Sequence, residues 1–210
     1  MIQENKRVYS SKARDIQAAQ TRSRILEAAK ELFLIEGFDR VTIGKLAEAA
    51  EVSMPTIYAI FKSKRGILQS LIDEAFPPNQ FEALVEEGEN EKSPKKRLGI
   101  TAKLARQIYD AERELMDILR SASVVAPEFK ELEQEREKRR YERQSESIKT
   151  MIEEKSLAKG LSPAKAHDMF WALTGRDMYR MLAIERGWTS DDYEKWLAQL
   201  LVKSLLDADI

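Results

Sequence analysis

The chain has 210 residues, 43% of them hydrophobic and 34% charged, which is the balance of a soluble globular protein. It contains no cysteine, so disulfides, thiolate metal ligands and cysteine nucleophiles are excluded. His167 is the only histidine, which excludes metal sites built from several imidazoles, and we expect neither a metal nor a cofactor.

No hydrophobic run in the sequence approaches the roughly 18 residues that a membrane-spanning helix needs. The first 15 residues lack the hydrophobic core of a secretion signal. We therefore expect a cytoplasmic protein.

Positive charge gathers at the N-terminus, although the 35 basic and 36 acidic residues of the whole chain give a net charge of −1. Up to residue 24, the acidic residues are Glu4 and Asp15. The basic residues in this stretch are Lys6, Arg7, Lys12, Arg14, Arg22 and Arg24. Because the distribution of charge matters more for nucleic-acid binding than its sum, we interpret residues 1–20 as a basic N-terminal arm.

The periodicity of hydrophobic residues is helical throughout and predicts an all-α fold. The first clear helix is marked by a stripe at i, i+3, i+4, i+7 and i+8 and is expected to end near Glu36, before a glycine cap at Gly37. The stripe consists of Ile25, Ala28, Ala29, Leu32 and Phe33.

Two short helices are predicted next, separated by a tight turn. Thr42 is expected to cap the first, which runs for about two turns. Ser53 is expected to cap the second, with Pro55 in its first turn, where a missing N–H costs no internal hydrogen bond. Ile57 and Phe61 are assigned to the core.

Ser63 is expected to cap a fourth helix, which ends before Pro77-Pro78. We take this proline pair as a domain boundary, so that residues 21–76 form one domain and residues 77–210 a larger helical one. The polar, acidic stretch 79–93 is interpreted as the tail of the fourth helix or as a connection.

The larger domain is predicted to begin with a long helix from Ser93-Pro94, punctuated by Ala126-Pro127. In the next segment, residues 128–143, 12 of 16 residues are charged. We favour a solvated helix face with pairs such as Glu135 to Arg139, over a second nucleic-acid surface, because acidic residues interleave with basic ones.

Two more helices are predicted after Gly160, the first opened by Ser162-Pro163 and the second capped by Thr189 or Ser190. The last helix has a broad hydrophobic stripe. Two such helices from each of two subunits can close a four-helix bundle, so we expect a homodimer formed through them.

Residues 41–64 combine a two-turn helix, a short turn and a second short helix that opens with small polar residues. Proteins use this helix-turn-helix arrangement to place one helix in the major groove of DNA. Helix N-termini and lysines suit phosphates, and residues near the start of the second helix can reach base edges or thymine methyl groups. The expected DNA-binding set is Thr42, Lys45, Ser53, Met54, Pro55, Thr56, Tyr58, Lys62 and Lys64.

Residues 21–72 resemble the N-terminal domain of the tetracycline-repressor (TetR) family of transcriptional regulators. The matching residues are Ile25-Leu26, Ala28-Ala29, Leu32-Phe33, Gly37-Phe38, Thr42-Ile43, Val52-Ser53, Thr56-Ile57-Tyr58, Phe61 and Ser63-Lys64. The resemblance implies a repressor that binds a double-stranded DNA operator as a homodimer and is released by a small-molecule effector.

By this resemblance, Thr42 and Lys64 would hold phosphates, Tyr58 would contact the DNA backbone, and Met54, Pro55 and Thr56 would face the bases. Gly44, Ala59 and Ile60 stand where relatives often have larger or polar reading residues. Glu51 occupies a turn position where glycine is common, and a left-handed backbone there costs on the order of 1 kcal/mol. Readout is therefore expected to depend on phosphates, methyl groups and duplex shape.

The resemblance also implies a ligand cavity in the larger domain. Bulky or polarizable residues suit an adaptable hydrophobic pocket, although residues of this kind more often form the core. The candidates are Tyr109, Met116, Trp171, Met178 and Tyr179. His167 and Arg176 are candidates for orienting a polar ligand group.

The sequence also bears on two other classes of function. A helical enzyme is disfavoured because the sequence lacks Gly-x-Ser-x-Gly, a phosphate-binding glycine loop and clustered metal ligands. A helical scaffold whose helix-turn-helix no longer binds DNA stays open, because the residues that could read bases are few.

Overall fold

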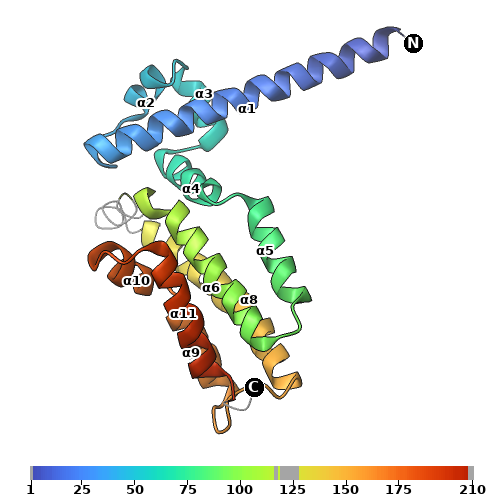
Figure 1. The fold of residues 1–210 in the computed structure, drawn as a ribbon. Coiled ribbons are helices and arrows are strands. Elements are labelled where there is room, and N and C mark those ends of the chain that lie inside the picture. The colour runs from blue at the N-terminus through green and yellow to red at the C-terminus, as the bar shows by residue number, and fades with distance from the viewer. Residues whose placement is uncertain (1, 116–117, 119–127, 208–210) are drawn as a thin grey trace. The chain divides into compact units, whose positions relative to one another are not determined.

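The computed structural model describes residues 2–115, 118 and 128–207, and the side chains of 2–13, 128 and 132 are not described. No strand occurs in these ranges, where an isolated bridge joins Leu157 and Leu206, so the all-α prediction is confirmed (Figure 1). The helices are α1 Ile2–Glu36, α2 Ile43–Ala49, α3 Met54–Phe61, α4 Lys64–Ala75, α5 Pro78–Asn90, α6 Pro94–Ala111, α8 Glu128–Glu153, α9 Pro163–Leu173, α10 Arg176–Tyr179, the π-helix η1 Arg180–Glu185 and α11 Ser190–Leu205. None of the described helices is both long enough and hydrophobic enough to cross a membrane.

The chain divides into two compact units. The first contains Met1–Glu74 and takes in Glu114–Phe129, and the second contains Ala75–Arg113 and Lys130–Ile210. Within the first unit, Phe129 packs edge-on against Phe38, with ring centroids 4.9 Å apart. The helical periodicity of the sequence does not predict that Phe129, so far along the chain, belongs to the first unit.

Helix α1 is longer than the sequence predicted. It begins at Ile2, so the segment interpreted as a basic N-terminal arm is itself helical and continues directly into the helix that carries the stripe from Ile25. Its predicted end at Glu36 is confirmed. Gly37 has a φ of +84°, and its N–H donates to the carbonyl of Phe33 at 3.1 Å, as expected of a left-handed cap.

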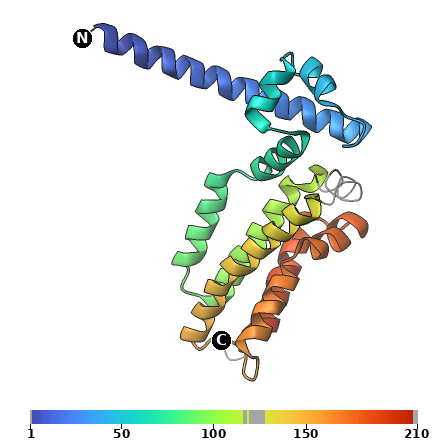
Figure 2. The same cartoon turned by 180° about the vertical axis from the view of Figure 1, so that it is seen from behind.

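The interpretation of residues 79–93 as a tail or a connection is wrong, because they contain most of a separate helix, α5. Pro77 and Pro78 stand at its N-terminus, where proline is compatible with a helix start. Leu84 is buried, and α5 packs against α6 (Figure 2). A single buried leucine leaves a weak periodic signal, which explains why the polar composition dominated the sequence interpretation.

Helix α6 ends at Ala111, well before the predicted end, and Glu112 caps it. Its carboxylate is buried and pairs with both Arg136 and Arg176. Both cationic partners are distant in sequence but belong to the same unit. A local pattern cannot predict such partners.

The penultimate helix of the sequence prediction is also broken, into α9, α10 and η1. Thr174 donates from Oγ1 to the carbonyl of Phe170 at 2.7 Å. Such a bond competes with the helix backbone. A Cβ at Gly175 would lie 3.0 Å from the carbonyl of Ala172, so glycine suits this sharp joint. The final helix, α11, begins where predicted, with Thr189 as its cap.

The polar segment 128–143 lies in α8 and is solvated on one side only. Lys138 pairs with Glu142 at 3.8 Å on the exposed side, in place of the expected pair of Glu135 with Arg139. The other side turns Arg140 and Gln144 inward. Charged residues thus occupy both faces of this helix.

Candidate nucleic-acid interface and helical cavity

Both short helices of the helix-turn-helix are capped by the residues that the sequence predicted. Thr42 Oγ1 accepts a hydrogen bond from the N–H of Lys45 at 3.2 Å, and Ser53 Oγ accepts one from the N–H of Thr56 at 3.3 Å. Glu51, in the turn, has the expected left-handed backbone with a φ of +53°. The turn retains glutamate there at a cost on the order of 1 kcal/mol.

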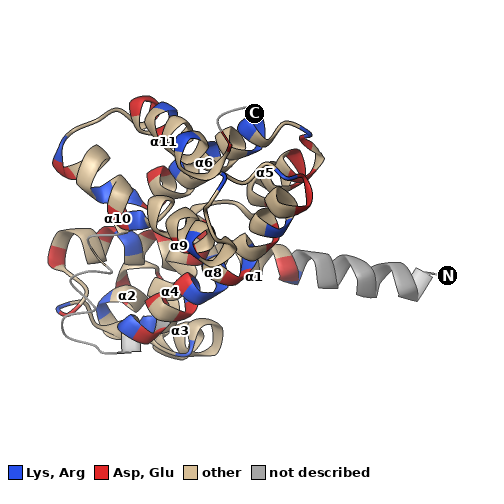
Figure 3. Cartoon of the chain, turned by 90° about the horizontal axis from the view of Figure 1, so that it is seen from below, with Lys and Arg blue, Asp and Glu red and all other residues tan. Residues whose placement is uncertain are grey.

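Helix α3 presents one face to the core and another to solvent. Ile57 and Phe61 are buried, whereas Met54 and Tyr58, one turn apart on the opposite side, are 51% and 50% exposed. Figure 3 shows that the α3 ribbon carries no acidic or basic residue. An uncharged, half-exposed helix face of this kind suits hydrophobic contact inside a groove.

Two of the three lysines near this face have local partners. Lys45 pairs with Glu36. Lys62 follows α3 with a left-handed backbone, φ +66°, and its ammonium donates to the carbonyl of Ala59 at 3.0 Å. Both side chains are exposed, so their positive charges face solvent around the helix-turn-helix.

Lys64 is held inside the domain. Its Nζ donates to the carbonyls of Phe38 at 2.7 Å and Val41 at 2.9 Å, and lies 4.2 Å from the centroid of the Phe38 ring. Burial lowers the pKa of this ammonium, and nearby Asp39 partly offsets the effect. The side chain therefore fixes the loop that leads into α2.

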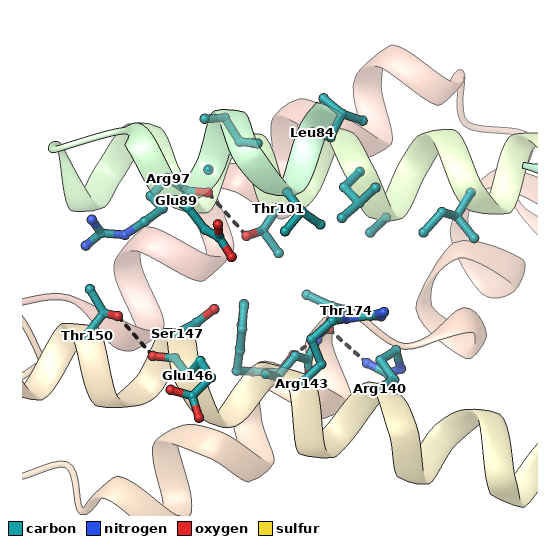
Figure 4. A pocket seen from close by; sticks show the side chains of 18 of the residues that line it. Leu84, Glu89, Arg97, Thr101, Arg140, Arg143, Glu146, Ser147, Thr150 and Thr174 are labelled. Carbon is teal, nitrogen blue, oxygen red and sulfur yellow. Dashed lines mark hydrogen bonds between the residues drawn. The ribbon is translucent and has the colours of Figure 1, made fainter. Parts of the chain in front are cut away.

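A cavity of about 380 Å³ lies within the second unit, between α5, α6 and α8, with α9 at its inner end (Figure 4). Hydrophobic side chains come from α5 and α6, among them Leu84, Ile100 and Leu104. Helix α8 contributes the polar side chains of Arg140, Arg143 and Gln144. The volume lies within the range of pockets that hold small organic molecules.

Three side chains that line the cavity form hydrogen bonds to Thr174, which lies at the break between α9 and α10. Arg140 Nη1 and Gln144 Nε2 donate to Thr174 Oγ1 at 3.0 and 2.8 Å. The hydroxyl of Tyr109 donates to the carbonyl of Thr174 at 2.8 Å, and complete burial raises the pKa of Tyr109 to about 12. The residues that line the cavity thus hold the joint between two helices.

Comparison with known proteins places the N-terminal domain in a family. Residues 25–71 match the model for bacterial regulatory proteins of the tetR family. The N-terminal domain of the chain is thus similar to that of the tetR family. The matched residues contain all of α2 and α3, as the resemblance of residues 21–72 predicted.

One relative of known sequence is the HTH-type transcriptional regulator TtgR of Pseudomonas putida. It is 34% identical over 94 residues, which are 45% of this chain and 43% of that protein. The match therefore spans less than half the length of this relative, and it concerns regulators rather than enzymes.

Solved structures extend the likeness in fold to most of the chain. A TetR-family regulator from Syntrophomonas wolfei superposes with a TM-score of 0.71 at 18% identity, over 87% of this chain and 93% of that one. SmeT, solved in complex with triclosan, gives a TM-score of 0.71 at 17% identity, over 90% and 92%. At these identities the likeness shows the tetR fold.

Of the ligand candidates predicted from the sequence, Tyr109 lines the cavity and Met116 lies outside the described residues. The other three lie elsewhere in the unit. Trp171 packs against Arg140, Tyr179 donates its hydroxyl to Asp110, and Met178 is half-buried but not part of the lining. Of these three residues, Tyr179 is buried in the core, as the alternative interpretation allowed, whereas Trp171 and Met178 are half-buried.

The candidates for orienting a polar ligand group are also placed away from the cavity. His167 stacks on Tyr141 with ring centroids 3.8 Å apart, and Arg176 pairs with Glu112. Sequence reasoning missed Arg140, Arg143 and Gln144, because it interpreted their segment as solvated. The spacing of Arg140 and Gln144, i and i+4 on one helix face, is the signal that could have found them.

The position of Lys64 yields a test that separates anchoring from phosphate binding. We expect Lys64→Met to destabilise the first unit by about 1–2 kcal/mol, because two loop carbonyls lose their charged donor. The salt dependence of DNA binding should keep its slope if this ammonium stays bonded to the carbonyls of Phe38 and Val41. Thermal unfolding followed by circular dichroism and affinity measured at several salt concentrations check both.

The matched control for this test is Lys62→Met, which removes an exposed lysine beside α3. It should leave stability within about 0.5 kcal/mol and reduce the salt slope by about one. A reduced salt slope in Lys64→Met would overturn the anchoring role.

Proposed function

We propose that the chain is a sequence-specific DNA-binding repressor that acts as a homodimer on a palindromic operator and is released by a small-molecule effector. The observation that carries the proposal is the capped α2-turn-α3 unit with the half-exposed face of Met54 and Tyr58. The tetR match over residues 25–71 supports it.

The proposed DNA contacts divide into two kinds. Met54, Pro55 and Thr56, at the start of α3, face base edges and thymine methyl groups, and Tyr58 contacts the backbone. The side chains that position the domain through phosphates are Thr42, Lys45, Ser53 and Lys62. Because α3 has no charged residue, recognition depends on methyl contacts and duplex shape more than on bidentate hydrogen bonds.

The proposed dimer forms through the last two helices of the chain. Around them, Met181 and Trp188 are exposed, and Trp188 packs edge-on against Trp196 with centroids 5.8 Å apart. Large exposed hydrophobic side chains that lie together favour an interface. A two-fold dimer would place its recognition helices on half-sites about one turn of duplex apart, or a multiple of it.

The proposed effector binds in the cavity of the second unit. SmeT, which shares the fold, binds triclosan, and a cavity of about 380 Å³ is large enough for a small organic molecule. A ligand that prefers the dimer arrangement with unsuitably spaced DNA-binding domains would lower operator affinity by that difference in binding alone.

The DNA claim is tested by fluorescence anisotropy on the full chain. Duplexes from the promoter region of its own gene, and duplexes selected from a randomised pool, are titrated beside a scrambled duplex at physiological salt. A specific site should bind at least about 10³-fold more tightly than the scrambled one, with two chains per site by light scattering. Equal affinity for all duplexes would favour the scaffold alternative and reject the proposal.

A further inference from the structure

The cavity contains one arginine whose charge is not neutralised by an acidic side chain. Arg143 is exposed on one side, lines the cavity and lies over the ring of Phe81, 4.7 Å from its centroid, and none of the ion pairs formed by described residues includes it. The other two lining arginines are paired: Arg97 with Glu154, and Arg140 with Glu137 at 2.5 Å.

The acidic residues of the lining do not compensate this charge. Glu146 is exposed and pairs with Lys149 at 2.6 Å. Glu89 is exposed, and Figure 4 shows it toward the Arg97 end of the cavity, away from Arg143 and Arg140. Arg143, which lies one turn from the paired Arg140 on α8, therefore makes this end of the cavity positive.

The pKa of Arg143 also supports a site for an anion. Burial and, second, the neighbouring charge of Arg140 lower the pKa of its guanidinium. Both effects disfavour the charged form of Arg143, and an anion beside the guanidinium would offset them.

The wall opposite Arg143 is hydrophobic. Helices α5 and α6 contribute Leu84, Val85, Ile100, Leu104 and Ile108, all of them lining the cavity. A ligand that fills the space therefore meets aliphatic side chains along its length and a guanidinium at one end.

We propose that the cavity binds an amphipathic carboxylate, with the carboxylate on the guanidinium of Arg143 and the hydrophobic body along α5 and α6. Arginine matches carboxylate geometry through two parallel hydrogen bonds. The lining of the cavity supports the binding of this ligand. Only the role of the ligand as the effector rests on the proposed function.

A carboxylate bound to Arg143 would lie next to the residues that hold the joint between α9 and α10. Gln144 follows Arg143 directly on α8, and Arg140 lies one turn before Arg143. The side chains of Gln144 and Arg140 both donate hydrogen bonds to Thr174, at the break between α9 and α10. A carboxylate on Arg143 lies beside this network and competes for the donors of Arg140. Occupancy of the cavity is thereby linked to the joint that leads into the proposed dimer helices.

The test compares three probes with the same ten-carbon chain by isothermal titration of the full chain without DNA, each below its aggregation concentration. Decanoate, decanol and decylammonium differ only in the head group. We expect decanoate to bind roughly tenfold to a hundredfold more tightly than the other two. Arg143→Gln should remove this preference and leave the affinity for decanol unchanged.

Arg139→Gln is the matched control, because Arg139 is an exposed arginine on the same helix and is absent from the lining. It should bind decanoate as the unaltered chain does. Equal binding of the three probes, tighter binding of decylammonium, or an undiminished preference in Arg143→Gln would overturn the proposal. Operator binding is measured separately, so its failure would reject the regulator and leave this result standing.

Discussion

Replacing Met54 and Tyr58 together with alanine is expected to weaken binding to a specific operator on the order of 100-fold. Each side chain is half-exposed on the same face of α3, and a good base or backbone contact contributes about 1–3 kcal/mol. The free energy of unfolding should change by less than about 1 kcal/mol, since neither residue belongs to the core. Anisotropy with specific and scrambled duplexes gives the first quantity, and urea unfolding gives the second.

The matched control removes two exposed hydrophobic side chains from α1 in the same unit. Leu34 is 45% and Ile35 81% exposed, and both lie outside the helix-turn-helix. Leu34→Ala with Ile35→Ala should bind the operator as tightly as the unaltered chain. If this control lost as much affinity as the α3 variant, the effect would reflect general surface hydrophobicity, and α3 would not be the recognition helix.

The caps, the end of α1 and the position of α3 could be predicted from the sequence because they depend on neighbours within a few residues. Thr42 and Ser53 satisfy N–H groups three positions away, and Gly37 adopts its conformation where the stripe of α1 stops. The proposed DNA-binding face follows from the same local rules, since Ile57 and Phe61 fix which side of α3 is buried.

Residues whose partners are distant in sequence could not be predicted. Lys64 was expected to face DNA and instead bonds to carbonyls more than 20 residues earlier in the chain. The composition of residues 128–143 predicted a solvated helix face, because an arginine counts as polar whether its side chain lies in solvent or inside the protein. Only the positions of α6 and α9 show that Arg140 and Gln144 turn toward Thr174.

The cavity illustrates the same limit. Of the bulky residues expected to border a ligand, Tyr109 does so, while Trp171 and Tyr179 pack against neighbours. Helical period identifies the buried side of a helix. It does not distinguish a side chain that fills the core from one that lines a space, because the difference depends on how far apart the neighbouring helices lie.

The largest effect on stability is expected from Glu112→Leu. The carboxylate is buried and pairs with both Arg136 and Arg176, so its removal leaves two half-buried guanidinium groups without their shared acid. Breaking such a buried network costs about 3–5 kcal/mol. The three tryptophans all lie in the second unit, so the tryptophan fluorescence of a urea titration reports the unfolding of that unit alone.

The control is Glu142→Leu, which removes the acid of the exposed pair with Lys138 on α8 and should cost less than about 1 kcal/mol. A further variant combines Glu112→Leu with Arg136→Met and Arg176→Met. Because hydrophobic residues of similar volume often replace a buried charge network without loss, this variant should regain most of the lost stability. A triple variant as unstable as Glu112→Leu would mean that the shape of the site, and not the uncompensated charge, accounts for the loss. In that case the turn after α6 would be fixed by packing, and the two arginines would have to be assigned another role.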